Sequence, residues 1–159
     1  MRLNAFYRRL FLVLAQLPMP GYWRQYLLRC AGIRFRIPRG ERPRVFIGAG
    51  VCFDSLYPNL IEIGNWTSIT TGVVILTHFM DTAAPAPGFR FVSGKIKIGR
   101  AVFIGAHSIL CKPVTIGDDA VIAAGSVVVS DIPSGEIWGG NPAHFIKKRN
   151  YDTNGSPSR

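Results

Sequence analysis

The stretch from Ile98 to Val128 reads IGRAVFIGAHSILCKPVTIGDDAVIAAGSVV, and a branched aliphatic residue returns in it every six positions. The series is Ile98, Ile104, Leu110, Ile116, Ile122 and Val128, and shorter runs with the same spacing precede it at Ile63, Ile69 and Ile75 and at Ile47 and Phe53. A period of six matches neither an α-helix nor a simply alternating strand. Three such units make one coil, and stacked coils align their aliphatic residues in a continuous interior. The pattern predicts a three-sided parallel β-helix.

The chain divides by composition into three segments. Residues 1–44 hold ten arginines against one acid, Glu41, so nine of the ten net positive charges lie there. The repeats occupy residues 45–149, and the polar tail 150–159 is expected to be disordered. With 159 residues, 48% of them hydrophobic, the chain is long enough for one domain with a buried core.

The basic segment 1–44 is expected to be helical. Apolar residues recur at helical spacing up to Pro18 and Pro20, and a second helix is expected from Gly21 to Cys30, with Gly32 as its stop. The first apolar run is too short to span a bilayer and lacks a clean signal-peptide cleavage site. Two compatible interpretations remain: the helices cap the core, or they form an amphipathic anchor on an anionic membrane.

The three cysteines, Cys30, Cys52 and Cys111, have unrelated spacings and form no disulfide framework. They indicate a reducing compartment, so we expect a cytoplasmic protein, with peripheral contact to the inner face of the membrane if residues 1–44 bind lipid.

The major break in the repeat lies between Ile75 and Ile98, where residues 77–95 read THFMDTAAPAPGFRFVSGK. Prolines and glycine suit a loop extruded from the coils, and functional residues concentrate on such loops. His78 lies at the start of this loop. His107 lies within a repeat and His144 lies beyond the repeats. Both are expected to be ordinary surface histidines.

Four stretches together resemble the hexapeptide-repeat acyltransferases, and the resemblance covers about residues 45–149. The stretches are ITTGVVILTHFMD, IKIGRAVFIGAHSIL, VTIGDDAVIAAGSVVVSDIPSG and GGNPAHFIKKR. They are closest to bacterial sugar and polysaccharide O-acetyltransferases, such as the maltose, galactoside and capsule enzymes. The resemblance implies an all-β core built as a left-handed parallel β-helix, with N-terminal helices and one extruded loop. It also implies a homotrimer, with active sites between subunits.

The resemblance implies that His78 is the catalytic base. An imidazole can take the proton of a sugar hydroxyl while the oxygen attacks a thioester, and no serine or cysteine nucleophile is then needed. Asp54 and Asp81 are candidates for a second polar group at the site. Such a group can bind the acceptor, or it can instead orient the imidazole. A turn at Asp54 and a loop cap at Asp81 are the structural alternatives.

The donor implied by the resemblance is acetyl-CoA, used as a co-substrate. Ala106 and Ala124 are expected along its pantetheine arm, and Ser130 lies in Val-Ser-Asp where family members have Thr-Lys-Asp. The missing lysine puts donor binding at Ser130 in doubt. Three cations in the stretch KKR can bind the donor phosphates in its place: Lys147, Lys148 and Arg149. The alternative is that this stretch is only a solvated terminus.

Two other classes of function fit less well. Gamma-type carbonic anhydrases share the fold but need three histidines on zinc at a spacing that is absent, so no metal is expected. A nucleic-acid-binding arm is disfavoured because the arginines interleave with Leu and Phe and no recognised motif is present. The sequence predicts an O-acetyltransferase that acts on a sugar of a bacterial surface glycan: capsule, exopolysaccharide or lipopolysaccharide. A free sugar or xenobiotic alcohol as acceptor, or a non-enzymatic trimer that binds membrane or nucleic acid, are the alternatives.

Overall fold

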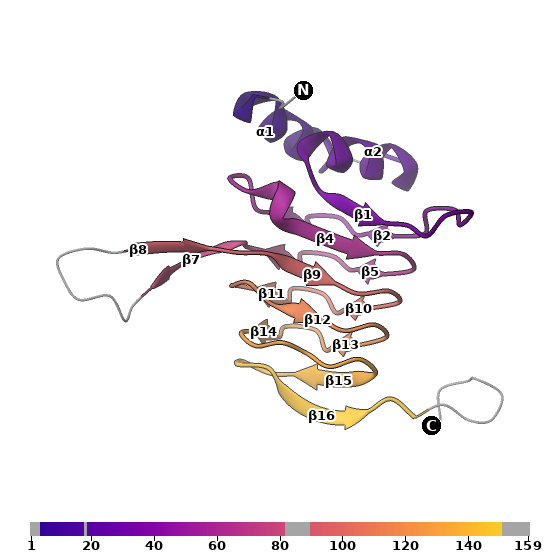
Figure 1. Ribbon diagram of the computed structural model, residues 1–159, viewed down its shortest axis with the longest axis vertical. Helices are drawn as coiled ribbons and strands as arrows, with labels where there is room; N and C mark the ends of the chain where they lie inside the picture. Colours follow the sequence, from indigo (N-terminus) through magenta and orange to yellow (C-terminus); the bar gives the residue numbers. More distant parts are fainter. Residues whose placement is uncertain (1–3, 18, 82–89, 151–159) are drawn as a thin grey trace.

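Short parallel strands stack in three columns and form a prism whose N-terminal end is covered by two helices (Figure 1). This computed structural model describes residues 4–17, 19–81 and 90–150. Each turn of the chain passes once through each column, so the repeat of six residues is one side of the prism and three repeats are one coil. The architecture is the predicted parallel β-helix.

The three sides are named faces A, B and C. Face A contains β1 (Arg34–Arg36), β4 (Ile61–Gly64), β9 (Ile96–Ile98) and β12 (Thr115–Ile116). Face B contains β2 (Phe46–Ile47), β5 (Ser68–Ile69), β10 (Phe103–Ile104), β13 (Val121–Ile122), β15 (Glu136–Gly139) and the antiparallel β16 (His144–Lys148). Face C contains β3 (Cys52–Phe53), β6 (Val74–Ile75), β11 (Ile109–Leu110) and β14 (Val127–Val128). A 3-10 turn, η1 (Pro58–Leu60), precedes β4.

The aliphatic residues of the repeat form the centre of the core, and further aliphatic side chains at the corners and from the helices complete it. The pairing of the repeat residues follows the predicted period: Ile63 opposite Ile98 opposite Ile116 on face A, Ile69 opposite Ile104 opposite Ile122 on face B, and Ile75 opposite Leu110 opposite Val128 on face C. Each of these side chains is at most 2% exposed. Burial of one such side chain stabilises the fold by roughly 1.5–3 kcal/mol, so the stack itself supplies the cohesion of the prism.

Small residues after the aliphatic position allow the corners to stack. A Cβ added at Gly105 would lie 2.4 Å from the backbone nitrogen of Ala124 in the next coil. A side chain there would push the two coils apart, which explains the glycine at this position.

The helices α1 (Ala5–Leu14) and α2 (Gly21–Ala31) pack against each other and cover the first coil. The second helix ends at Gly32, whose φ of 113° is the left-handed conformation expected of a glycine stop. Beyond the stop expected at Gly32, β1 already pairs in parallel with β4, Arg34 opposite Glu62. The first strand of the stack therefore lies within the basic segment 1–44.

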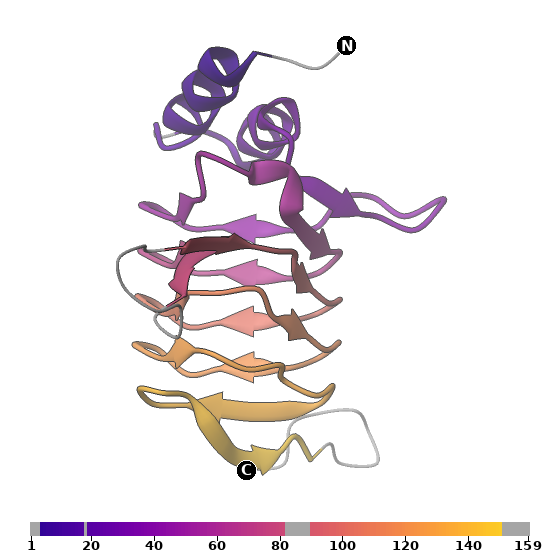
Figure 2. The same ribbon diagram turned by 60° about the vertical axis from the view of Figure 1, so that its left-hand side comes forward.

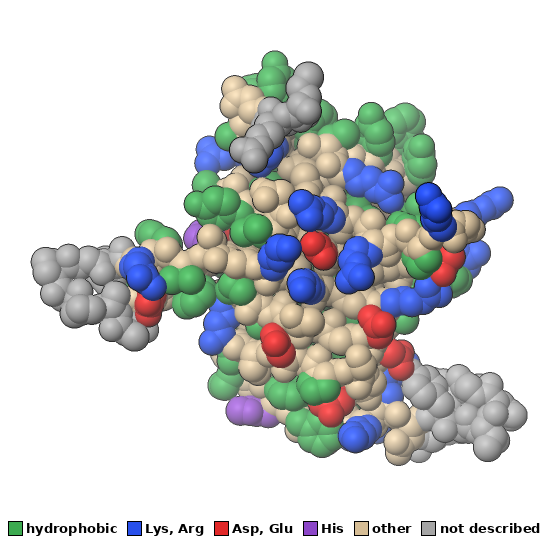
Figure 3. Space-filling model, viewed as in Figure 1, with side chains coloured by type: hydrophobic (Ala, Val, Ile, Leu, Met, Phe, Trp, Pro, Cys, Tyr) green, Lys and Arg blue, Asp and Glu red, His purple; other side chains and the backbone are tan. Residues whose placement is uncertain are grey.

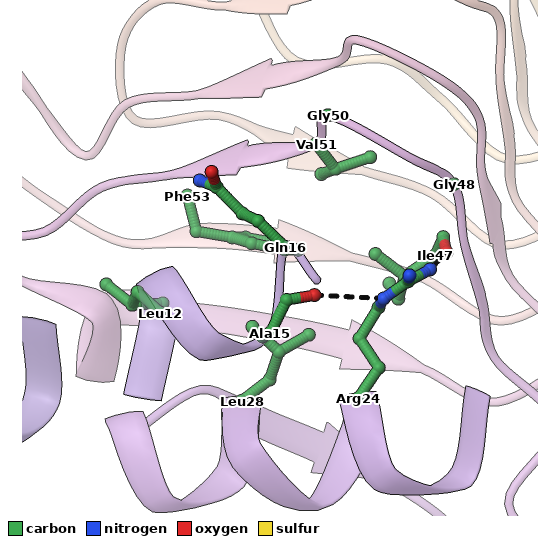
Figure 4. Close-up of a pocket in the computed structure, with 10 residues that line it drawn as sticks. All are labelled: Leu12, Ala15, Gln16, Arg24, Leu28, Ile47, Gly48, Gly50, Val51 and Phe53. Atoms are coloured by element: carbon green, nitrogen blue, oxygen red, sulfur yellow. Dashed lines mark hydrogen bonds between the residues drawn. The ribbon is translucent and has the colours of Figure 1, made fainter. Parts of the chain in front are cut away.

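Arg24 connects the helices to the first coil (Figure 4). Its guanidinium donates to the carbonyl oxygens of Ala15 at 3.0 Å, Leu17 at 3.2 Å and Ile47 at 2.6 Å. Leu12 and Leu28 are buried in the same joint. One arginine of the basic segment thus has a structural role, since it satisfies carbonyl groups at the end of α1 and in the first coil.

The break in the repeat forms a hairpin that projects from the prism (Figure 2). Its strands are β7 (His78–Asp81) and β8 (Arg90–Ser93), paired antiparallel with His78 opposite Ser93. The prolines and Gly88 of the predicted loop and all of the tail except Asn150 lie outside the described residues.

Candidate active site

His78 is the first residue of the hairpin, at the corner where face C gives way to face A. The coil leaves β6 at Ile75, and after Leu76 and Thr77 the chain turns outward into β7. The imidazole lies between two aromatic rings, Tyr57 at 6.3 Å and Phe91 at 6.1 Å between centroids. The side chain is 26% exposed, so part of the ring can be reached from solvent.

Asp54 holds the imidazole from the coil above. Its Oδ2 lies 2.7 Å from Nδ1 of His78 and also accepts from the backbone N–H of Thr77 at 2.9 Å and from Oγ1 of Thr77 at 2.5 Å. Its Oδ1 accepts from the N–H groups of Leu56 at 2.7 Å and Tyr57 at 3.3 Å. The side chain is 2% exposed. Both oxygens are therefore used within the protein.

The charge of Asp54 determines the tautomer of His78. Burial by itself raises the pKa of Asp54, but hydrogen bonds from Thr77 and His78, with backbone N–H groups of Leu56 and Thr77, overcome it and lower the pKa to about 2. The carboxylate is thus ionised at neutral pH and can only accept. Nδ1 of His78 must then carry the proton, and in the neutral ring Nε2 is left with a free lone pair.

The acceptor-binding role predicted for Asp54 does not fit this geometry, because a carboxylate that is 2% exposed cannot contact a substrate. The alternative left open by the sequence, orientation of the imidazole, fits it. The turn that was the structural alternative also exists, since Oδ1 accepts from the next turn of chain. A single side chain shapes the turn that carries Tyr57 and holds the ring of His78.

Asp81 lies three residues beyond His78 on β7, so the two side chains project from opposite faces of the hairpin. Its carboxylate lies 3.9 Å from the guanidinium of Arg90, its cross-strand neighbour. This position ties the two strands together and does not support the acceptor-binding role predicted for Asp81.

Ala106 and Ala124 stack in successive coils at the corner between faces B and C, where the N–H of Gly125 donates to the carbonyl of Ala106 at 2.8 Å. His78 lies at the opposite end of the strands of face C. About five extended residues separate the two corners, which is roughly 16 Å. One chain therefore does not bring His78 together with Ala106 and Ala124.

The corner that carries His78 continues down the prism through Lys112 and Ser130. The register of face C, Ile75 opposite Leu110 opposite Val128, places Lys112 one coil below Thr77 and Ser130 one coil further. Ser130 is exposed and Lys112 half-buried. Sequence reasoning missed Lys112 and Thr77, although the spacing of 18 residues between Lys112 and Ser130 was visible in the repeat.

The cations of the last strand have different surroundings. Lys147 and Lys148 are exposed on β16, whereas the guanidinium of Arg149 is paired with the carboxylate of Asp119. His107 and His144 are exposed, as expected of surface histidines. Within the described ranges, no three His, Cys, Asp or Glu side chains gather as a metal site requires.

The comparisons with known proteins agree with the repeat. The family model "Bacterial transferase hexapeptide (six repeats)" matches residues 95–130. Galactoside O-acetyltransferase of Escherichia coli K12 is 46% identical over 55 residues, which are 35% of this chain and 27% of that enzyme. The chain spans about half the length, or less, of the curated relatives that it matches.

Two solved structures share the fold over nearly the whole chain. A maltose O-acetyltransferase from Clostridium difficile 630 has a TM-score of 0.68 at 25% identity, over 91% of this chain and 85% of that one. A hexapeptide-repeat acetyltransferase from Vibrio cholerae, solved with acetyl coenzyme A, has a TM-score of 0.67 at 20% identity, over 91% and 86%. The fold is the left-handed parallel β-helix that the resemblance implied.

Proposed function

We propose that this chain, which belongs to the hexapeptide-repeat acyltransferases, moves an acetyl group from acetyl-CoA to a hydroxyl of a sugar in a bacterial surface glycan. The observation that carries the proposal is the pair of His78 and Asp54. A partly exposed imidazole is fixed through Nδ1 by a buried carboxylate, which leaves Nε2 as a proton acceptor beside two aromatic rings.

In the proposed reaction, Nε2 of His78 takes the proton of the sugar hydroxyl as its oxygen attacks the thioester carbonyl. The carbon–sulfur bond breaks, and the imidazolium returns the proton to the thiolate of coenzyme A. Asp54 acts as a positioning residue, because its carboxylate fixes the ring and stabilises the imidazolium that forms. No covalent intermediate on the protein is required.

The surroundings of His78 favour a sugar as the acceptor. Tyr57 is 44% exposed and Phe91 66% exposed, and both rings flank the imidazole. Aromatic rings offer flat apolar faces that pack on the C–H faces of sugars, and the phenol of Tyr57 adds a polar contact. The aromatic pair therefore replaces Asp54 and Asp81 in our assignment of acceptor contacts.

The outer faces of the prism support a homotrimer. Face A carries a charged column, Arg34, Glu62, Lys97 and Thr115 in register. Face B instead carries Phe46, Ser68, Phe103, Val121 and Ile137, and face C carries Cys52, Val74, Ile109 and Val127. Two adjacent apolar sides on one prism suit a closed ring in which face B of one copy packs on face C of the next.

A trimer would also complete the site. His78 and the stacked alanines Ala106 and Ala124 lie at different corners of one chain, so a donor that contacts both needs residues from two copies. The backbone and small side chains at the alanine corner leave room for the narrow pantetheine arm. Exposed Lys147 and Lys148 can reach its phosphates, whereas Arg149 is already paired with Asp119.

The test is a screen of purified protein with acetyl-CoA and candidate acceptors: free sugars, sugar nucleotides and lipid-linked sugars. The product is read by mass, and an increase of one acetyl group on a sugar is expected. In the positive reaction His78→Gln should lower kcat by ~10²–10⁴-fold, while the affinity for acetyl-CoA stays within about twofold. A His78→Gln protein that keeps a tenth of wild-type turnover would remove the histidine from the mechanism.

A further inference from the structure

The outer surface of the two helices is the most apolar exposed region of the described residues. Eight of their seventeen exposed large hydrophobic side chains lie there, and together they define the cap surface: Phe6, Tyr7, Leu10, Val13, Leu17, Tyr22, Trp23 and Tyr26. Figure 3 shows hydrophobic side chains gathered at this end of the molecule. Exposed apolar patches of this kind mark surfaces that meet a partner or a membrane.

The cap surface is not the face with which the helices cover the core. Leu12 and Ala15 of the first helical segment and Leu28 and Ala31 of α2 are buried against the prism. The outer stripe is separate: Phe6, Leu10 and Val13 follow one another at i, i+4 and i+7 on one side of α1, and the exposed Leu17 lies in the turn after the helix. The capping role is therefore met by one side of the helices, and the other side remains exposed and available to a partner.

The chemistry of the cap surface favours lipid over protein. Three of its members, Tyr22, Trp23 and Tyr26, lie together on α2 with ring centroids 5.7 and 6.4 Å apart. Tyr and Trp combine an apolar body with a polar group and concentrate where a bilayer meets water. Trp23 is 57% exposed and Tyr22 74%, so both can enter the headgroup region without rearrangement of the helix.

The charges around the cap surface have one sign. Arg9 and Arg29 are exposed, Arg8 is half-buried, and the two helices contain no Asp or Glu. Arginines that flank an apolar helical surface complement anionic headgroups, and each adds roughly a fivefold gain in partitioning. In the part of the chain that the structure describes, no helix is long and apolar enough to cross a bilayer.

We propose that the cap surface docks on the surface of an anionic lipid bilayer, with the helices lying in the headgroup region and the prism projecting away from it. The proposal does not depend on acetyl transfer, because it concerns the cap alone. It adds a partner to the proposed function: an acceptor sugar held on a lipid carrier would lie on the same surface.

Vesicle co-sedimentation tests the proposal with the full chain and no substrate. Vesicles of phosphatidylcholine, with or without phosphatidylglycerol, are pelleted with the protein at low and high salt. The protein should pellet only with phosphatidylglycerol, and less at high salt. Tyr22→Ser/Trp23→Ser should weaken binding at least about tenfold, and Arg9→Gln/Arg29→Gln, which removes two exposed cations, about 30-fold.

Matched controls lie at the opposite end of the prism. Phe145 and Ile146 are 51% and 55% exposed on β16, beside Lys147 and Lys148. Phe145→Ser/Ile146→Ser and Lys147→Gln/Lys148→Gln remove the same kinds of group and should leave vesicle binding unchanged. Circular dichroism melts confirm that each variant is folded, which is expected because the substituted side chains are largely exposed.

A second readout does not depend on loss of binding. Lipids with brominated acyl chains should quench tryptophan fluorescence in the wild type, and Trp23→Phe should abolish the quenching while the protein still pellets. Equal recovery in the supernatant with both lipid compositions would overturn the proposal. The proposal would also be overturned in favour of a protein partner by two results together. Brominated lipids would not quench tryptophan fluorescence, and the cap variants would dissociate an assembly that the wild type forms without lipid.

Discussion

Replacing Asp54 by Asn keeps the shape of the side chain and removes its charge, so it isolates what the carboxylate contributes. Five hydrogen bonds reach the two oxygens, three at Oδ2 and two at Oδ1. An amide places a donor at one of these positions, where it meets another donor. If the NH₂ group faces His78, Nδ1 becomes the acceptor and the proton moves to Nε2. The ring is then in the wrong tautomer, and kcat should fall by ~10²–10⁴-fold.

The stability effect follows from the pKa of Asp54, which is about 2 in the folded protein against an ordinary 3.8. A difference of almost two units corresponds to about 2 kcal/mol in favour of the charged folded state. Because the folded pKa is the lower one, this stability is present above pH 4 and is lost as the pH falls toward 2. About 1 kcal/mol should remain at pH 3.

Urea unfolding of the wild type and Asp54→Asn at pH 6 and pH 3 measures the stabilisation by Asp54 at each pH. The other carboxylates contribute equally to both proteins, so their effect cancels in the difference. The wild type should be the more stable at pH 6 by about 2 kcal/mol, and the gap should roughly halve at pH 3. Asp118→Asn is a matched control, because Asp118 also accepts a backbone N–H, from Arg100 at 2.8 Å, but is exposed. It should change stability by less than ~0.5 kcal/mol. A gap that does not change with pH, or an Asp54→Asn enzyme with a tenth of wild-type kcat, would refute the reasoning.

Three further predictions concern the trimer, the donor and the core. Phe103→Glu places a charge in the apolar column of face B, and sedimentation should show monomers where the wild type is a trimer; a wild-type monomer with full activity would contradict the assembly. Lys147→Gln/Lys148→Gln removes the two exposed cations that we assign to the phosphates of the donor, and KM for acetyl-CoA should rise about fivefold while kcat stays nearly unchanged; an unchanged KM would exclude them from donor binding. Ile104→Ala creates a cavity at a fully buried position and should cost about 2–5 kcal/mol in urea unfolding, whereas a loss below 1 kcal/mol would mean that the coils collapse around it.

The repeat could be predicted because its signal is local and redundant. Each aliphatic residue from Ile98 to Val128 reports one side of the prism, so a single irregular position such as Leu110 does not obscure the period. Between the coil of β9, β10 and β11 and the coil of β12, β13 and β14, the register follows directly from the count of 18. The repeat did not reveal β1, because this strand has three residues and contacts the core through Phe35, and no repeat precedes it to set the period.

The site was only partly predictable. His78 was identified by the interruption of the repeat, but its link to Asp54 spans 24 positions and joins two neighbouring coils. The count of repeats cannot reveal that contact, because the stretch from Phe53 to Ile61 departs from the period of six. Thr77 was missed for the same reason: its hydroxyl matters only through Asp54. The pairing of Asp81 with Arg90 required the register of the hairpin, and part of the connection between its strands lies outside the described residues.

The stacking of coils sets the distance between His78 and the helices. Neighbouring strands lie about 4.8 Å apart, and β6, which leads to His78, is the second strand of face C from the helices. The imidazole is thus about 10 Å below the helices, and a layer of helices adds about another 10 Å. With the helices in the headgroup region, His78 would lie no more than about 20 Å above the acyl chains. A sugar attached close to its lipid carrier could reach His78. The far end of a long glycan would lie farther from the membrane than His78.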